Sequence, residues 1–255
     1  MKEFRYFYAP EAPDNLMLPE DEAAHCVRVL RLSEGEHIYL TNGRGLFMEG
    51  EITAASAKKC MFRVIDYKQQ DSEWTGHLHL AMAPTKNNDR TEWFAEKATE
   101  IGFNELSFLN CCHSERKVIK TERIDKILVS AMKQSHKVYK PILNDMEDFC
   151  KFIKHDFKGQ KFIAHCYDES DINGEEIVKS EAEKKMDGGK PFLLDVLEPK
   201  CDAVVMIGPE GDFSIEEVKE ALKHGFRSVS LGRSRLRTET AALVAVHLMN
   251  LKHAK

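Results

Sequence analysis

The sequence predicts an α/β protein in which a small N-terminal β-barrel precedes a larger domain built on a largely parallel sheet. Two observations support this fold class. The first 70 residues carry closely spaced β-forming segments, whereas short apolar strands alternate with amphipathic helices from residue 77 onward. The polar run 68–76 (KQQDSEWTG) separates the two patterns. We therefore expect one domain over residues 1–70 and a second over residues 77–255.

The N-terminal barrel is predicted from three β-forming segments, at 36–41, 46–53 and 60–67. Asn42-Gly43 lies between the first two segments and is a typical hairpin turn signal. Ahead of them, the acidic run that follows Pro19 begins a short helical pattern that stops before Gly35. These elements indicate a small β-barrel module.

The C-terminal domain is predicted from regular alternation. We expect strands at 77–83, 106–109, 161–166, 203–207 and 228–231, and helices at 92–101, 122–134, 215–224 and 241–253. Strands separated by helices at this spacing favour a parallel sheet that is covered on both faces. The acidic segment 168–200 is weakly periodic, and we expect a helix-bearing excursion near the surface there.

Composition excludes several classes of protein. The chain has 255 residues, is 42% hydrophobic and holds seven cysteines with no C-x-x-C pair, which argues against disorder and against a disulfide scaffold. No apolar run approaches the roughly 18 residues that a membrane helix needs. We therefore expect a cytoplasmic protein that does not associate with a membrane.

Charge is unevenly distributed along the chain, whose net charge is −5. Residues 141–222 carry 10 basic and 20 acidic side chains, whereas residues 223–255 carry 7 basic and 1 acidic. Because salt screens charges beyond about 10 Å, basic segments at 116–140 and 223–237 can face a polyanion although the whole protein is acidic. Charge alone equally allows ordinary solvated helix faces.

The first candidate site is the loop GPEGDFS at 208–214, between a buried apolar strand and a helix. Ser214 and Glu217 have the spacing of a capping box, which fixes the start of the helix. Glycine lets a backbone approach a ligand closely, and loops at the carboxyl ends of parallel strands are where α/β sheets bind ligands. We favour a ligand site over a purely structural turn because Glu210 and Asp212 lie close together in the loop.

The second candidate site is the loop at 231–242. A strand again ends in glycine, here Gly232, and a helix follows that Thr238 or Thr240 can cap. Arginines at 233, 235 and 237 repel one another unless an anion or a carboxylate such as Glu239 or Glu210 neutralises them. The alternative is that they point into water.

These two loops, in this order, resemble the SPOUT superfamily of methyltransferases, and most closely the family that methylates N3 of a uridine in 16S ribosomal RNA. The resemblance covers nearly the whole chain. It includes these further segments: RYFY at 5–8, HCVRVLR at 25–31, KNNDR at 86–90, EKATEIG at 96–102 and SAMKQS at 130–135. The sequence departs from the family pattern in two places, at Ser234-Arg235 in the last loop and at Lys133, which stands in place of an acid.

The resemblance implies a C-terminal SPOUT domain with a deep trefoil knot, a PUA-like N-terminal barrel that helps to hold RNA, and a homodimer in which two subunits complete each site. It also implies S-adenosylmethionine as the cofactor and S-adenosylhomocysteine as the product. The absence of a G-x-G-x-x-G motif agrees with this, because a Rossmann-type methyltransferase is expected to carry one. The implied cofactor residues are Ile207, Gly208, Glu210, Gly211, Leu231, Gly232, Leu236, Arg237, Thr238 and Glu239. Ala164 and His165 would close the pocket, although His165 can equally be an ordinary strand-end histidine.

Methyl transfer to uracil N3 requires loss of the N3 proton and needs no metal. We expect Glu210 to take the proton, with Glu239 or a water as the alternatives, and Arg237 or Arg90 to stabilise charge on the uracil oxygens. The expected partner is 16S rRNA or the assembled small subunit. Trp93 and Phe213 can stack on bases or belong to the core. The expected RNA contacts are Arg5, Arg28, Arg31, Lys86, Arg90, Arg116 and Lys137.

Two alternative functions stay open at this point. One is a ribose 2′-O-methyltransferase of the same superfamily, although its asparagine-and-arginine signature is not evident. The other is an RNA-binding or ribosome-assembly protein that no longer catalyses. The glycines at 208, 211 and 232 argue against a decayed cofactor pocket.

Overall fold

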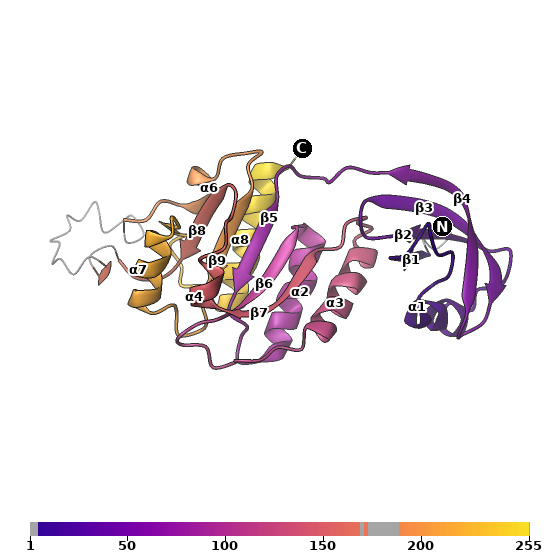
Figure 1. Cartoon of the computed structure of the whole chain (residues 1–255), viewed down its shortest axis with the longest axis horizontal. Helices are drawn as coiled ribbons and strands as arrows, with labels where there is room; N and C mark the ends of the chain where they lie inside the picture. The colour runs from indigo at the N-terminus through magenta and orange to yellow at the C-terminus, as the bar shows by residue number, and fades with distance from the viewer. Residues whose placement is uncertain (1–4, 169–170, 173–188, 255) are drawn as a thin grey trace. The chain divides into compact units, whose positions relative to one another are not determined.

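The computed structural model describes residues 5–168, 171–172 and 189–254, so most of the acidic segment predicted at 168–200 lies outside the described residues (Figure 1). The chain divides into two compact units. One comprises the residues up to Ser72 together with Leu128–Lys140, and the other comprises Glu73–Ile127 and the chain from Pro141 onward. Each unit is built around its own sheet.

The N-terminal unit contains a four-stranded sheet in the order β1-β2-β3-β4. The strands are β1 (Tyr6–Tyr8), β2 (His37–Thr41), β3 (Leu46–Ala55) and β4 (Cys60–Gln69). Strand β1 runs parallel to β2 and the other pairs are antiparallel. The three strands predicted from the sequence are present, whereas β1 was not predicted because three residues are too few to show a pattern.

Local sequence explains the turn and the helix of this unit. Gly43 has φ +72°, and the side-chain oxygen of Asn42 accepts hydrogen bonds from the backbone of Arg44 and Leu46. The expected early helix is present as α1 (Glu20–Ala24), which continues into a π-helix, η1 (His25–Val29). Both pack on a core whose largest members include Phe7, Ile38, Leu40, Met48 and Phe62.

The C-terminal unit confirms the predicted parallel sheet. Six strands lie in the order β10-β8-β9-β5-β6-β7, and every pair is parallel. They are β5 (Leu78–Met82), β6 (Glu105–Asn110), β7 (Ile142–Asp148), β8 (Gln160–Ala164), β9 (Ala203–Ile207) and β10 (Arg227–Val229). The edge strand β7 was not predicted, because its sequence ILNDMED is polar and only partly buried.

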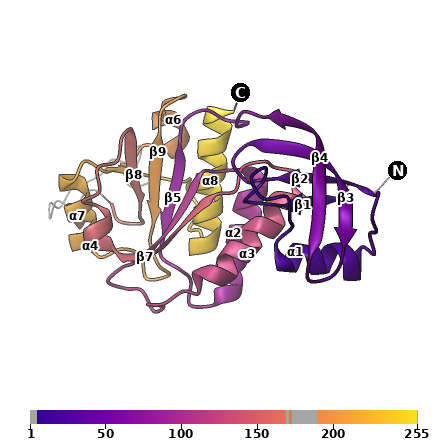
Figure 2. The ribbon, with the colours of Figure 1, turned by 45° about the vertical axis from the view of Figure 1, so that its right-hand side comes forward.

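Helices cover both faces of this sheet. The helices of this unit are α2 (Asn88–Ile101), α4 (Phe149–Phe152), α6 (Leu193–Val196), α7 (Ile215–Lys223) and α8 (Thr238–His253). Helix α3 (Thr121–Gln134) begins in this unit, and its residues from Leu128 onward belong to the N-terminal unit. Helices α2 and α8 lie together on one side of the strands, and α4 and α7 lie on the other (Figures 1 and 2). The α4–α7 side has a core that includes Phe149, Phe152, Met206, Phe213 and Val218. No helix in the described part of the chain is long and apolar enough to cross a membrane.

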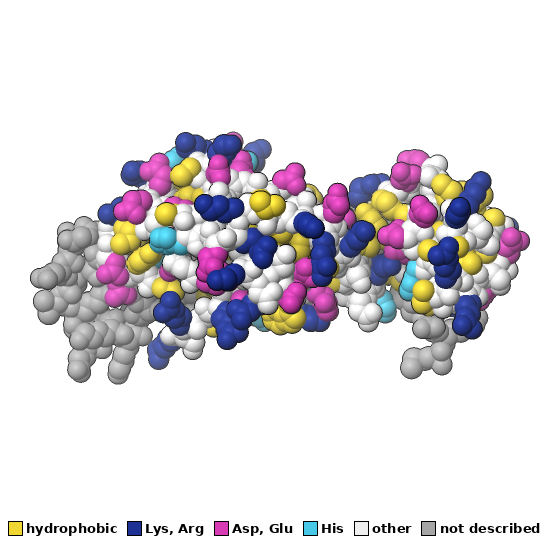
Figure 3. Space-filling view, turned by 90° about the horizontal axis from the view of Figure 1, so that it is seen from below, with side chains coloured by type: hydrophobic (Ala, Val, Ile, Leu, Met, Phe, Trp, Pro, Cys, Tyr) yellow, Lys and Arg dark blue, Asp and Glu magenta, His cyan; other side chains and the backbone are white. Residues whose placement is uncertain are grey.

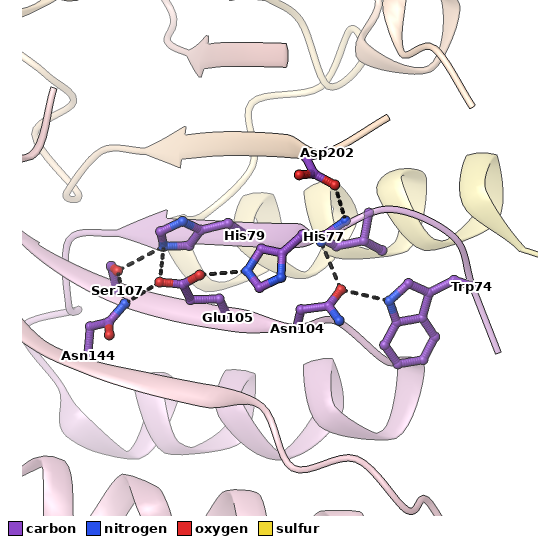
Figure 4. A network of polar contacts seen from close by, with 9 residues as sticks. Trp74, His77, His79, Asn104, Glu105, Ser107, Asn144 and Asp202 are labelled. Carbon is purple, nitrogen blue, oxygen red and sulfur yellow. Dashed lines mark hydrogen bonds and ion pairs between the residues drawn. The ribbon is translucent and has the colours of Figure 1, made fainter. Parts of the chain in front are cut away.

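A polar network lies at the amino ends of β5 and β6, at the edge of the sheet opposite to the two candidate loops (Figure 4). The Glu105 carboxylate is 2.6 Å from Nε2 of His77 and accepts a 2.6 Å hydrogen bond from Asn144. His79 is buried, and its Nε2 lies 2.8 Å from Oγ of Ser107. The hydrogen bond from His77 lowers the pKa of Glu105 to about 2, and burial lowers the pKa of His79 to about 4.

This network predicts acid sensitivity. Glu105→Gln is expected to lower the free energy of unfolding by about 2 kcal/mol at pH 7, a value reduced for solvent screening of this half-buried group, because the ionised carboxylate accepts both bonds. That difference should vanish as pH falls from the usual carboxyl range to about 2, where the folded protein also protonates Glu105. His79 also lowers the free energy of unfolding as pH falls from 6.5 to about 4. In this range the unfolded chain binds a proton at His79 and the folded chain does not.

Denaturant titrations of both proteins at several pH values check this prediction. Glu122→Gln, on the exposed side of α3, is the matched control and should leave the titration curve unchanged. Glu105 raises the pKa of His77. The stability that the protonated His77 contributes is therefore lost as pH rises. A difference between Glu105→Gln and the native protein that is independent of pH would contradict the assignment.

Candidate functional site

The two predicted loops meet at one cavity of about 850 Å³ at the carboxyl ends of β8, β9 and β10. Parallel strands that pair directly end at the same edge of the sheet, so the loops that follow them converge. Among the residues predicted to hold a cofactor, those that line the cavity are His165, Ile207, Gly208, Glu210, Gly211, Leu231, Gly232, Leu236, Arg237 and Thr238. Glu239 lies beside this set, within 3.8 Å of the cavity residue Arg90.

The loop after β9 has the local structure that its sequence predicts. Ser214 caps α7, and both bonds of the capping box with Glu217 are present. Asp212 has φ +63°, and its carboxylate accepts hydrogen bonds from the backbone N–H groups of Phe213 and Cys166. The Asp212 side chain therefore connects this loop to the loop after β8.

Close packing explains the first glycine of the loop. A Cβ atom at Gly208 would lie 3.0 Å from both the backbone nitrogen and a ring carbon of Phe213, whose side chain is fully buried. Because Phe213 belongs to the core, it cannot move aside easily. Glycine at 208 thus keeps the end of β9 and its loop close together beneath the cavity.

Gly208→Ala is therefore expected to displace the loop and to weaken binding of a ligand in the cavity by about tenfold, or about 1.4 kcal/mol. The matched control is Gly35→Ala in the N-terminal unit, where φ is +85° but no atom lies within 4 Å of the added Cβ. Both changes should cost stability, and only the first should change the dissociation constant measured by calorimetry. Equal ligand affinity in the two variants would show that the loop does not depend on this contact.

Three side chains connect this loop and the start of α7 to the segments that follow β5 and β6. The Glu210 carboxylate accepts a 2.8 Å hydrogen bond from the backbone N–H of Lys86. Nδ1 of His113 lies 3.1 Å from the carbonyl oxygens of both Gly211 and Asp212. Glu217 accepts a 2.8 Å bond from the backbone of Cys112. The loop is therefore held by the segments that follow two neighbouring strands.

The second loop follows β10 and leads into α8. Gly232 has φ +125°, a conformation that favours glycine. The helix begins at Thr238, with Arg237 in the cap position and no side-chain cap. The predicted threonine cap is wrong, because the threonine at 238 already lies in the first helical turn.

Arg90 and Glu239 form an ion pair beside the cavity, with Nε of Arg90 3.8 Å from a carboxylate oxygen of Glu239. Arg90 lies in the first turn of α2 and Glu239 in the first turn of α8. Helix N-termini carry partial positive charge, so Glu239 is favourably placed whereas Arg90 needs a carboxylate partner. Glu239 is 7% exposed, and no hydrogen bond to its Oε2 is found within the described residues.

His165 lines the cavity in a buried position, with Nε2 2.8 Å from Oγ of Ser228. Burial, reinforced by the charge of Lys190, lowers the pKa of His165 to about 4, so the ring is neutral at pH 7. Lys190 donates hydrogen bonds to the backbone carbonyls of His165 and Tyr167. A neutral ring can bond to a ligand but cannot supply positive charge.

The predicted RNA contacts are divided between the two units. Arg5, Arg28, Arg31 and Lys137 lie in the N-terminal unit, whereas Lys86, Arg90 and Arg116 lie in the C-terminal unit. Several already have partners: Arg5 pairs with Glu36, and Nζ of Lys86 is 2.6 Å from Glu115. Basic and acidic side chains are interspersed over the face in Figure 3, so charge on that face does not single out an RNA surface.

The sequence did not indicate some of the residues that line the cavity. Cys166, Tyr167 and Ser230 line it, yet nothing in their local sequence marks them. Their positions follow from strand order, because β8 pairs with both β9 and β10. Of the two aromatic residues considered for base stacking, Phe213 is fully buried and Trp93 is 44% exposed. Only Trp93 is therefore available on the surface.

The cavity fits S-adenosylmethionine by size and by lining. Its volume is within the range of about 300–1,000 Å³ that is usual for small-molecule sites. Glycine backbone at 208, 211 and 232 and the half-buried Leu231 and Leu236 offer both polar and apolar surface. No cluster of three or more potential metal ligands occurs within the described ranges.

A family model described as an RNA methyltransferase domain matches residues 72–250, well over half of the chain. The chain belongs to the RNA methyltransferase family. A second model, described as an RNA methyltransferase PUA domain, matches residues 18–65 and confirms the PUA-like character predicted for the N-terminal part.

Relatives of this RNA methyltransferase agree with the family. The chain is 27% identical over 242 residues to the Bacillus subtilis protein named ribosomal RNA small subunit methyltransferase E, covering 92% of this chain and 89% of the relative. A Porphyromonas gingivalis structure named as a probable rRNA-methyltransferase is 38% identical, covers 98% of both chains and has a TM-score of 0.83. A Legionella pneumophila protein described as a methyltransferase, solved with bound S-adenosylmethionine, is 25% identical, covers 98% of both chains and has a TM-score of 0.76.

Proposed function

We propose that this RNA methyltransferase transfers a methyl group from S-adenosylmethionine to N3 of a uridine in 16S ribosomal RNA. The observation that carries the proposal is the cavity that the two glycine loops form at the carboxyl ends of β9 and β10. The bound cofactor of the Legionella pneumophila relative and the name of the Bacillus subtilis relative support the donor and the class of RNA. The N3 position rests on the sequence resemblance alone.

The bound donor supplies an electrophilic methyl group, and the residues of the two loops would hold it. Gly208, Gly211 and Gly232 allow the backbone to approach it, and Leu231 and Leu236 offer apolar surface for its ring. The His165 ring is neutral and is held by Ser228, so it contributes shape to the cavity wall and no charge. These residues position the donor and take no part in proton transfer.

The chain must also remove the N3 proton and stabilise negative charge on the uracil ring. We assign proton removal to Glu210, because one of its oxygens bonds to the Lys86 backbone and thereby fixes the carboxylate at the cavity wall. Arg90 and Arg237 line the same cavity near the N-termini of α2 and α8. Their charges and the two helix ends produce a positive potential that favours the developing uracil anion.

We also propose a homodimer, a trefoil knot in the C-terminal domain and action in the cytoplasm on 16S rRNA or the assembled small subunit. A feature of α8 supports the dimer. This helix is apolar around most of its circumference, yet Leu251 is 55% exposed. The apolar surface of a helix is normally covered.

The experiment that tests the function is methylation of 16S rRNA and of isolated small subunits by the purified protein, followed by mass spectrometry of the nucleosides. The expected product is 3-methyluridine formed only when S-adenosylmethionine is present. A 2′-O-methylated nucleoside would contradict the N3 assignment. Binding of the donor with no methylated nucleoside on either substrate would favour the non-catalytic alternative.

A further inference from the structure

The segment that follows β5 is held by hydrogen bonds within itself, to α2 and to the cavity residue Glu210. Thr85 is fully buried, and its hydroxyl donates a 2.7 Å hydrogen bond to the carbonyl of Asn87. The backbone N–H of Thr85 donates to Oγ1 of Thr91 in α2. Asn87 then caps α2, whose first turn carries Arg90. We call residues 85–87 the β5–α2 turn.

Arg116 binds this turn from the opposite side to Glu210. Its Nε donates a 3.1 Å hydrogen bond to the carbonyl of Thr85, and its Nη2 donates a 2.5 Å bond to the carbonyl of Lys86. The peptide group between Thr85 and Lys86 is thus bonded on both sides, because its C=O accepts from Arg116 and its N–H donates to Glu210. A guanidinium group is suited to this task, since its planar fork reaches two acceptors in fixed geometry.

We propose that Arg116 is a positioning residue for methyl transfer and not a phosphate contact. By fixing the β5–α2 turn, its guanidinium orients the Lys86 N–H that holds the Glu210 carboxylate at the cavity. The same turn sets the start of α2 and hence the place of Arg90. This inference rests on the proposed function, because it assumes that Glu210 and Arg90 are the catalytic groups whose positions matter.

The expected effect is on turnover. Arg116→Ala should lower kcat by about 10- to 100-fold, since a shift of about 1 Å in a reacting group can cost that much. The KM values for RNA and for S-adenosylmethionine should stay within about twofold, because neither ligand loses a direct contact. Arg116→Lys should recover only part of the loss, since an ammonium group cannot bond both carbonyls in fork geometry.

Salt dependence separates this role from phosphate binding. A residue that contacts a phosphate contributes about one to the slope of log affinity against log salt. The slope for RNA binding should therefore be the same in Arg116→Ala and the native enzyme. Lys117→Ala is the matched control, because it removes one positive charge from the adjacent exposed position and should leave kcat unchanged.

Hydrogen exchange at the Lys86 amide tests the contact without any enzyme assay. Exchange should be faster in Arg116→Ala than in the native protein or Lys117→Ala, and Arg116→Gln serves if the alanine variant fails to fold. Unchanged exchange, or a salt slope smaller by about one with kcat retained, would overturn the inference. If the native protein transfers no methyl group but the exchange result holds, the proposed function fails and the structural part of the inference stands.

Discussion

Replacing Glu210 with glutamine is expected to lower kcat by about 10²- to 10⁴-fold, the usual range for loss of a general base. Affinity for S-adenosylmethionine should change little, because the glutamine side-chain oxygen can still accept the Lys86 N–H bond. Single-turnover measurements on 16S rRNA, together with calorimetry of cofactor binding, separate the two quantities.

Two further variants sharpen this prediction. Glu210→Ala removes both the base and the hydrogen-bond acceptor, so it should lower kcat and also release the β5–α2 turn, which hydrogen exchange at the Lys86 amide would report. Glu216→Gln removes an equal charge from an exposed position in the first turn of α7 and should behave like the native enzyme. Full activity in Glu210→Gln would exclude this carboxylate as the base.

Replacing Arg90 with alanine is expected to lower kcat by about 10²- to 10³-fold, as found when one preorganised charge stabiliser is removed. The same change leaves the carboxylate of Glu239 without its ion-pair partner in a 7% exposed position. We therefore also expect a loss of about 1 kcal/mol in the free energy of unfolding. Kinetic assays and denaturant titrations measure the two effects independently.

A double variant separates catalysis from stability at this position. Arg90→Ala combined with Glu239→Gln removes the unpaired charge, so stability should recover while kcat stays low. The matched control is Arg123→Ala, because Arg123 forms a comparable pair with Glu92 (Nε to carboxylate oxygen 2.6 Å) and neither residue lines the cavity. Recovery of turnover together with stability would show that Arg90 acts only through folding.

The extent to which sequence predicts this fold differs between its elements. The strand Ala203–Ile207 and the helix that starts after Ser214 were predicted to within a residue, because an apolar run and a capping box are local signals. Helix α2 begins at Asn88, four residues before the predicted start, because its cap is Asn87 and the polar residues that follow hide the apolar pattern. The edge strand β7 lacks that pattern altogether.

The candidate site was also predictable from the sequence only in part. The two glycine loops are visible in the sequence because their glycines and strand–helix junctions are local features. Arg116 was expected to contact phosphate because it lies in a basic segment, and its hydrogen-bond partners within the protein are not visible in the sequence. Its bonds to Thr85 and Lys86 connect residues about 30 positions apart, and they depend on β5 and β6 being neighbours. Strand order is a tertiary property that a single sequence does not display.

The most direct test of the central claim is a crystal structure of the protein with S-adenosylmethionine or S-adenosylhomocysteine. The account predicts ligand density between the loops at 208–213 and 231–238, in contact with the glycine backbone at 208 and 232. Density at another place in the chain, or loops that close the cavity and leave no room for the ligand, would contradict it.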